Sequence, residues 1–215
     1  MIRIATAALV LAVTACSGVN RNPIGAVRPG QLTPAEQARA DSGRPPWTDA
    51  DVHFMQGMIV HHNQAVLIAG WAPSHGAGPA ILRLSERIVV AQRDEIAIMA
   101  TWLRDRRLSV PDSTAIQHTM PGMPDHPMPM PGMLTAEQLR RLDAARGVEF
   151  DRLFLTYMIQ HHQGAVTMVD QLLGSTGAAQ EVLLYKIASD VYADQTTEIV
   201  FMTNMLNALP PGGRP

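Results

Sequence analysis

A short phrase occurs twice in this chain, one hundred residues apart. Residues 58–66 read MIVHHNQAV and residues 158–166 read MIQHHQGAV, and the match extends upstream to Asp51 and Asp151. A weaker echo follows each copy, because a Gln-x-x-Glu-Ile-x-x-Met pattern begins at Gln92 and again at Gln195. Imidazoles, carboxylates and thioethers thus recur with pseudo-symmetry, which is typical of a site shared between two halves. Metal is the first ligand to consider for such a set.

The N-terminus has the pattern of an export signal. Arg3 precedes an apolar run over residues 4–13, and VTAC at residues 13–16 is typical of a bacterial lipobox. The run is too short to cross a bilayer as a mature helix, so residues 1–16 are predicted to be a cleaved lipoprotein signal peptide with Cys16 as the lipidated residue. We therefore expect an exported chain, anchored by lipid in the cell envelope on the periplasmic side or at the cell surface. The alternative is a stray thiol inside an uncleaved signal.

The composition favours a buried core and argues against nucleic acid as a partner. Hydrophobic residues make up 47% of the chain and charged residues 17%. Lys and Arg number 17 against 19 Asp and Glu, a net charge of −2 with no basic stripe. Cys16 is the only cysteine, which excludes an intramolecular disulfide.

The periodicity of the apolar residues predicts an all-α fold. They recur at three- and four-residue steps along four segments that are separated by helix breakers. The four predicted helices cover about residues 48–69, 79–106, 148–173 and 178–207. Two helical hairpins in tandem predict a four-helix bundle. The predicted organisation is a flexible tether at 17–47, a bundle domain at 48–207 (first hairpin 48–106, loop 107–134, second hairpin 135–207) and a disordered tail at 208–215.

The paired histidines fall on different sides of their helices. At about 100° per residue, His62 shares an apolar stripe with Met58, whereas His61 lies on the flank of that stripe. We therefore expect His62 to face His162 near the bundle axis, and His61 and His161 to lie at seams between helices.

Glu95 and Glu198 lie on otherwise apolar stripes and need partners there, because an unpaired buried charge is costly. The facing histidines are the candidates. A metal-free interpretation treats the same residues as a polar network that fixes helix register. It also treats the repeated methionines as core filler, and Asp51 and Asp151 as favourable charges in the first helical turn.

The segment before residue 134 is a second informative feature. Five methionines and two histidines alternate there with five prolines. Proline at this density forbids a helix, so the thioethers cannot line a packed helical face. Thioether and imidazole together select copper over hard cations, whereas the alternative is a low-complexity linker. The candidate loop ligands are His118, Met120, Met123, His126, Met128, Met130 and Met133.

These motifs resemble the bacterial "domain of unknown function 305" family over about residues 48–206. The resemblance implies a ferritin-like four-helix bundle that is commonly exported and often lipid-anchored, and some members are linked to copper binding and copper resistance. Its signature falls here on Met58, His61, His62, Gln92, Glu95 and Met99, and then on Met158, His161, His162, Gln195, Glu198 and Met202. The histidines, glutamates and methionines of this set are the candidate metal ligands of the bundle. The family often has a further methionine seven residues after the first histidine. Met168 supplies it in the second half but Ile68 replaces it in the first, so the two halves are not equivalent if that methionine is a ligand.

The leading hypothesis is an exported protein that binds copper, or another transition metal, for sequestration, trafficking or tolerance. Its partners would be the ion and, through the N-terminal lipid, the membrane. Because imidazole must lose its proton to ligate, binding by the bundle is expected to weaken as pH drops through ~6.5. One alternative is a ferritin-like metallo-oxidase, but the Glu-x-x-His pattern of such sites is missing, which weighs against an enzyme. The other is a metal-free envelope interaction or structural bundle.

Overall fold

The computed structural model describes residue 33, residue 39, residues 42–43 and two long stretches, 45–112 and 130–210. The predictions for Cys16, for the loop ligands from His118 to Met128 and for the last residues of the tail lie outside these residues. The chain divides into residues 1–44 and residues 45–215, and the description below concerns the second unit.

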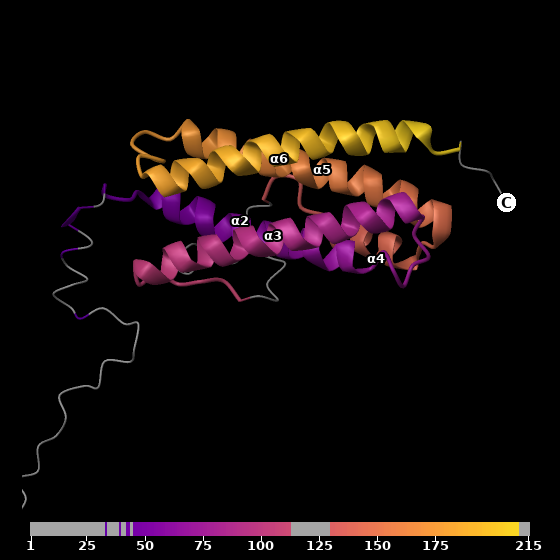
Figure 1. The fold of residues 1–215 in the computed structure, drawn as a ribbon, viewed down its shortest axis with the longest axis horizontal. Coiled ribbons are helices and arrows are strands. Elements are labelled where there is room, and N and C mark those ends of the chain that lie inside the picture. The colour runs from indigo at the N-terminus through magenta and orange to yellow at the C-terminus, as the bar shows by residue number, and fades with distance from the viewer. Residues whose placement is uncertain (1–32, 34–38, 40–41, 44, 113–129, 211–215) are drawn as a thin grey trace, which may run out of the picture. The chain divides into compact units, whose positions relative to one another are not determined.

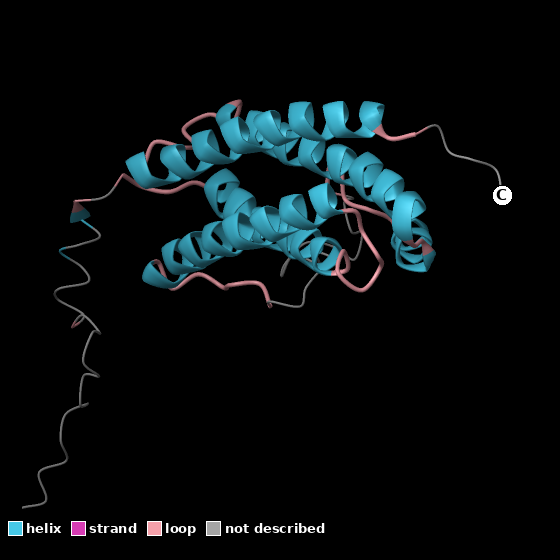
Figure 2. Cartoon of the chain, turned by 45° about the vertical axis from the view of Figure 1, so that its right-hand side comes forward, coloured by secondary structure: helices cyan, strands magenta, loops and turns pink. Residues whose placement is uncertain are grey.

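Two helical hairpins form the bundle, and no strand occurs among the described residues. The helices are α2 (Asp49–Gly70), α3 (Pro79–Asp105), α4 (Ala136–Ala144), α5 (Gly147–Leu173) and α6 (Val182–Ala208). Helices α2 and α3 make one hairpin, α5 and α6 make the other, and α4 is a short helix before α5 (Figures 1 and 2). The predicted all-α fold is thus confirmed. Within the described ranges, no helix has the length and apolarity needed to cross a membrane.

Local chemistry explains where the helices begin. Thr48 and Asp51 form a reciprocal cap at α2, in which the Thr48 amide donates to Asp51 Oδ2 at 2.7 Å and the Asp51 amide donates to Thr48 Oγ1 at 3.3 Å. Helix α6 begins at Val182, later than the predicted residue 178. The reason is the turn before it, where Gly177 and Ala179 adopt φ values of 76° and 55° that a right-handed helix cannot contain.

The two equivalent aspartates of the repeat tie the hairpins together. Asp51 Oδ1 accepts a hydrogen bond from the Ala179 amide at 2.7 Å. Both Asp151 oxygens accept from the Gly78 amide at 3.1 Å. Each carboxylate therefore holds the turn of the opposite hairpin, a role beyond the predicted interaction with the helix dipole. Burial raises the pKa of Asp151, and the Gly78 hydrogen bond opposes that rise.

These contacts also fix how α2 and α5 cross. The start of α2 lies at the α5–α6 turn and the start of α5 lies at the α2–α3 turn, so the two helices run antiparallel. One apolar cluster joins the first half of α2 to the second half of α5, and the other joins the second half of α2 to the first half of α5. The repeated histidines occupy the middle of both helices. A polar layer therefore lies between two apolar clusters, at the centre of the bundle.

Candidate metal centre

The four repeated histidines are completely buried. His61 of α2 and His161 of α5 lie ring to ring, with centroids 3.8 Å apart and planes inclined by 36°. The centroids of sequence neighbours are farther apart, at 6.4 Å both for His61 and His62 and for His161 and His162. The layer is therefore centred on the pair His61–His161.

We expected His62 to face His162, but the rings that contact each other between the two helices are those of His61 and His161. A helix wheel gives the direction of a side chain relative to its own helix only. Helices α2 and α5 cross antiparallel at their midpoints, so the flank of each apolar stripe lies at their common seam. The expectation that His61 and His161 lie at a seam holds, and the seam is the one between the two hairpins.

Each second histidine of the repeat instead contacts a glutamate of its own hairpin. His62 Nε2 lies 2.7 Å from Glu95 Oε2, and His162 Nε2 lies 2.8 Å from Glu198 Oε2. The predicted pairing of the buried glutamates with histidines is thus found. Burial raises the pKa of Glu198, but its contacts with His162 and Arg87 outweigh burial and leave the pKa below its usual value.

Burial holds the pKa of both central imidazoles far below the ordinary 6.5. It lowers the pKa of His61 to about 3, helped by His62 and His162 and opposed by a backbone hydrogen bond. It lowers the pKa of His161 well below 6.5, the other three histidines lower it further, and a backbone contact with His61 opposes the shift. Both rings are neutral at physiological pH. For this pair, the lowered pKa moves the expected proton competition to a pH below 6.5.

The end of the methionine-rich loop reaches the histidine layer. His61 Nε2 donates to the carbonyl oxygen of Pro131 at 3.0 Å. An ideal Cβ at Gly57 of α2 would lie 3.6 Å from Met130 Sδ and 3.3 Å from Met168 Cε, which places both methionines beside this stretch of α2. Sequence reasoning treats the loop and the bundle as separate candidate sites, whereas the structure joins them at Met130 and Pro131.

Unpaired polar atoms are concentrated in this layer. Among the residues that the structure describes, Nδ1 of all four histidines and Nε2 of His161 have no hydrogen-bond partner. The side-chain amide of Gln92 and the Oε1 atom of Gln195 are also buried and unpaired. Leaving a buried polar atom unpaired costs about 1–3 kcal/mol, so native cores rarely collect so many in one place.

The candidate thioether ligands lie in the two apolar clusters that border the layer. Met58, Met99 and Met168 belong to one cluster, and Met158 and Met202 to the other. Met133 is half-buried, near the end of the loop. In the described ranges, no three side chains from among His, Cys, Asp and Glu are grouped so as to hold one ion.

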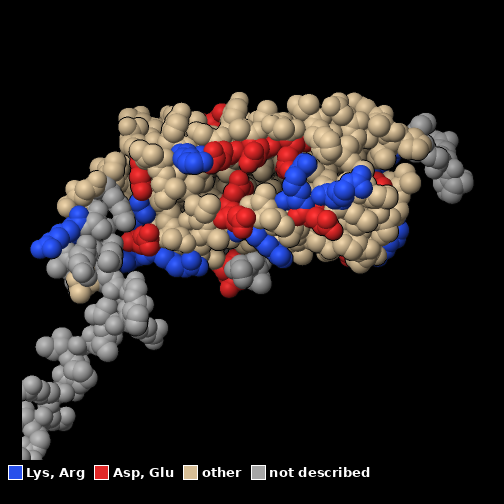
Figure 3. Space-filling model, viewed as in Figure 1, with Lys and Arg blue, Asp and Glu red and all other residues tan. Residues whose placement is uncertain are grey.

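Carboxylates gather outside the histidine–glutamate pairs, and Figure 3 shows acidic side chains along the middle of one face. Burial raises the pKa of Asp194, and the neighbouring charges of Glu95, Glu198 and Asp190 raise it further, against the opposing effect of Lys186. Glu95 and Glu198 thus belong both to the buried layer and to a negative surface region. Such a region raises the local concentration of cations.

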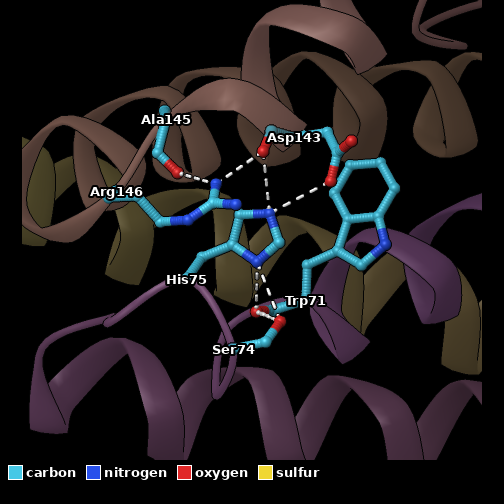
Figure 4. A network of polar contacts seen from close by, with 6 residues as sticks. All are labelled: Trp71, Ser74, His75, Asp143, Ala145 and Arg146. Atoms are coloured by element: carbon cyan, nitrogen blue, oxygen red, sulfur yellow. Dashed lines mark hydrogen bonds and ion pairs between the residues drawn. The ribbon is translucent and has the colours of Figure 1, made fainter.

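One further buried histidine, His75, is a structural residue that the sequence did not single out. Its Nδ1 lies 2.9 Å from the Trp71 carbonyl oxygen, and its Nε2 lies 3.0 Å from the Asp143 carbonyl oxygen (Figure 4). The ring also packs against Trp71 and Phe150. His75 therefore fastens the α2–α3 turn to the end of α4. The helix breakers around it predicted only a turn, because its partners Asp143 and Phe150 are distant in sequence.

The fold and the site define a four-helix bundle of two similar hairpins with a buried layer of four histidines at its centre. Residues 51–206 match the family model of the Domain of unknown function (DUF305), and the chain belongs to this family. A DUF305 fragment from Deinococcus radiodurans is 27% identical, with a TM-score of 0.64 over 77% of this chain and 100% of that one. A DUF305 protein from Streptomyces coelicolor, provisionally described as secreted, is 25% identical, with a TM-score of 0.63 over 77% of this chain and 98% of that one.

Structures of CopM are also similar to this chain. CopM in its Cu(II)-bound form is 28% identical, with a TM-score of 0.57 over 73% of this chain and 95% of that one. CopM has also been solved in Cu(I)-bound and Ag-bound forms. Among curated proteins, the uncharacterized protein L153 of Acanthamoeba polyphaga mimivirus is 33% identical over 58 residues, and the chain spans 38% of its length.

Proposed function

We propose that this protein is an exported metal-binding protein whose histidine layer takes copper for sequestration, trafficking or tolerance. The proposal rests on the hydrogen bonds of three histidines. His61 donates from Nε2 to a backbone carbonyl, and His62 and His162 contact glutamate carboxylates through Nε2, while each Nδ1 is buried and unpaired. Metal-ligating histidines almost always donate the other ring N–H to a carboxylate or a backbone carbonyl. The unpaired Nδ1 atoms are therefore the proposed ligand atoms.

The glutamates and the methionines around the histidines have different roles in this proposal. Glu95 and Glu198 act by orienting His62 and His162, because their oxygens already accept the Nε2 protons. This changes the sequence interpretation, in which both glutamates were candidate ligands. We take the buried thioethers as further ligands, since among the described residues no three side chains from His, Cys, Asp and Glu are grouped so as to hold one ion. The candidates are Met58, Met99, Met158, Met168 and Met202.

The donor set and the similar structures agree on the class of metal. Imidazole and thioether suit copper in both common oxidation states, whereas magnesium and calcium prefer oxygen ligands. The similar CopM structures hold Cu(II), Cu(I) and Ag. When bound, such an ion would bind further soft ligands or change its oxidation state. The chain's own contribution is to keep neutral imidazoles dry and oriented.

A metal-free polar network accounts less well for the layer. Such a network fixes helix register only when its members are satisfied, yet five imidazole nitrogens in the described layer have no partner. An oxidase is also less well supported. Its dinuclear sites draw several glutamates from the bundle helices, and the two glutamates of this layer contact histidines.

We also propose, from the first sixteen residues, that the chain is exported and anchored by lipid. The lipobox at residues 13–16 supports cleavage before Cys16 and lipidation of that residue. Residues 17–47 would then be a tether that holds the bundle domain, residues 48–207, at a distance from the membrane. The provisional description of the Streptomyces coelicolor protein as secreted supports export in this family.

The decisive test is copper binding by a variant in which all four layer histidines are replaced by glutamine. Copper bound per chain is measured by dialysis against buffered Cu(I) and Cu(II), with helical content followed by circular dichroism. We expect the tight site to disappear while the helices remain. The matched control is His53→Gln, which changes an exposed histidine on the same helix. Equal uptake by the wild type and the four-glutamine variant would assign the paired histidines to structure.

A second pair of variants keeps the test decisive if the four-glutamine protein does not fold. Glu95→Gln and Glu198→Gln retain an oxygen that accepts the histidine N–H but lose the negative charge. Loss of such an outer contact typically weakens metal binding about 10- to 100-fold. Unchanged affinity in both variants would contradict the proposed orienting role.

The loop is tested separately. Replacing residues 116–129 by a Gly/Ser linker of the same length removes His118, Met120, Met123, His126 and Met128. It leaves the segment that contacts His61 in place. We expect this variant to lose a weaker, Cu(I)-preferring capacity and to keep the bundle site. Unchanged Cu(I) capacity would identify the loop as a linker.

A further inference from the structure

The last residues of the loop, Met130–Leu134, are called the strap here because they cross the helices beside the histidine pair. The strap lies directly on the α5 backbone at Gly164. A Cβ at this position would lie 2.0 Å from the Pro131 carbonyl oxygen and 2.6 Å from Gly132 Cα. Only glycine allows such a close approach of two backbones.

Side chains of α2 and α5 hold the strap on both sides. The Leu134 amide donates to Gln64 Oε1 at 2.7 Å, and Gln64 Nε2 donates to the Leu134 carbonyl oxygen at 3.2 Å. Gln160 Nε2 donates to the Gly132 carbonyl oxygen at 3.3 Å. The Leu134 side chain is itself buried. The strap backbone is thus fastened at Pro131, Gly132 and Leu134 over the α2–α5 seam.

The anchoring residues occupy positions at which the two copies of the repeat differ. Gln64 is equivalent to Gly164, and Gln160 is equivalent to Val60. The strap can therefore dock in one orientation only, although the helices beneath it are related by pseudo-symmetry. As a result His61 receives the Pro131 carbonyl as a partner, whereas both ring nitrogens of His161 stay unpaired.

We propose that the strap positions His61, and that Gln64, Gln160 and Gly164 act on the histidine pair through it. A carbonyl oxygen can only accept, so the Pro131 contact keeps the His61 proton on Nε2 and leaves the lone pair on Nδ1. The two central histidines therefore differ: His61 offers one fixed nitrogen and His161 offers either. This inference concerns the metal-free chain and does not depend on copper binding.

The test uses Gly164→Ala in the full-length, metal-free protein. The added methyl group must displace the strap, because its nearest contact is backbone. Gly70→Ala is the control, since it adds the same atom to α2 with nothing within 4 Å. Two-bond proton–nitrogen correlation spectra of ¹⁵N-labelled protein report the His61 tautomer. Hydrogen exchange of the Leu134 amide reports whether the strap is docked.

In the wild type and in Gly70→Ala, we expect His61 to carry its proton on Nε2. In Gly164→Ala we expect faster Leu134 exchange, a mixture of His61 tautomers and an increase of about tenfold in His61 modification by diethyl pyrocarbonate, which corresponds to loss of one buried hydrogen bond. His161 should show a mixture of tautomers in every variant.

A second variant, Gln64→Leu, releases the strap by removing two hydrogen bonds while keeping a side chain of similar size, and it should give the same His61 spectrum. A His61 ring that keeps its Nε2 proton and its protection after the strap is released would overturn the proposal. Unchanged Leu134 exchange in both variants would overturn it too, because these residues would then not hold the strap. Unchanged copper binding by the histidine variants would contradict the proposed function and leave this inference untouched. The two proposals therefore fail independently.

Discussion

Acid should destabilise the metal-free protein through His61. Burial lowers the pKa of this imidazole from 6.5 to about 3. At pH 5 the folded protein therefore keeps the ring neutral, whereas the unfolded chain is largely protonated. Each pH unit below the unfolded pKa costs about 1.4 kcal/mol of unfolding free energy, so the ~1.5 units down to pH 5 cost about 2 kcal/mol.

The lowered pKa of His61 determines the direction of the stability change and the pH range in which it occurs. A lowered pKa means that the unfolded state binds the proton more tightly, so the contribution is complete above pH 6.5 and is lost as pH falls. The loss stops once the folded ring also protonates, near pH 3. His161 acts in the same direction, because its pKa is also lowered. The contributions of the other titrating groups are shared by the variants compared.

The measurement is urea unfolding at pH 7 and pH 5 with a chelator present, for the wild type and for His61→Gln. Glutamine keeps an N–H for the Pro131 carbonyl but has no titrating group in this range. We expect the wild type to lose about 2 kcal/mol more than His61→Gln between the two pH values. His53→Gln should behave as the wild type does. Equal losses in the wild type and in His61→Gln would refute the assignment of acid sensitivity to this buried ring.

Three further predictions concern other contacts. Glu181→Ala should lower the free energy of urea unfolding by about 3 kcal/mol, because it leaves the buried guanidinium of Arg106 without its carboxylate. Asp51→Ala should cost about 2 kcal/mol in the same assay, since it removes both the α2 cap and the acceptor of the Ala179 amide. Cys16→Ser should release the chain from the membrane fraction of fractionated cells or block its processing, whereas unchanged membrane association would point to another form of attachment.

Features that depend on local sequence could be predicted. The three- and four-residue spacing of apolar side chains predicted the four long helices. The need of a buried glutamate for a partner gave the contact of Glu95 with a histidine. Each of these inferences uses residues that are close in sequence or a rule that holds in any fold.

Features that depend on how helices cross could not be predicted in this way. Which histidine meets its counterpart depends on the antiparallel crossing of α2 and α5, and that crossing depends in part on Asp51 and Asp151 reaching the turn of the other hairpin. The docking of the strap was also missed, because a Pro- and Met-rich segment carries no periodic signal. A local clue existed: Gln64 and Gly164 break the repeat next to the histidines.

The pattern of identity and difference between the two copies follows from what covers each side of α2 and α5. Identical positions include the aspartates that hold the turns and the four histidines, which are the contacts that a pseudo-two-fold arrangement makes twice. Several of the differing positions contact the connecting segment, which exists only once. On α2, Gln56 donates to Ser109, Asn63 donates to the Asp112 carbonyl oxygen, and Gln64 binds the strap. These residues lie on the side of α2 away from the apolar stripe, yet they are buried. Helix α2 is buried on both sides in this way, so its sequence holds two sets of residues. One set is the same in both copies of the repeat and packs in the bundle, and the other differs between the copies and contacts the segment that joins the two hairpins.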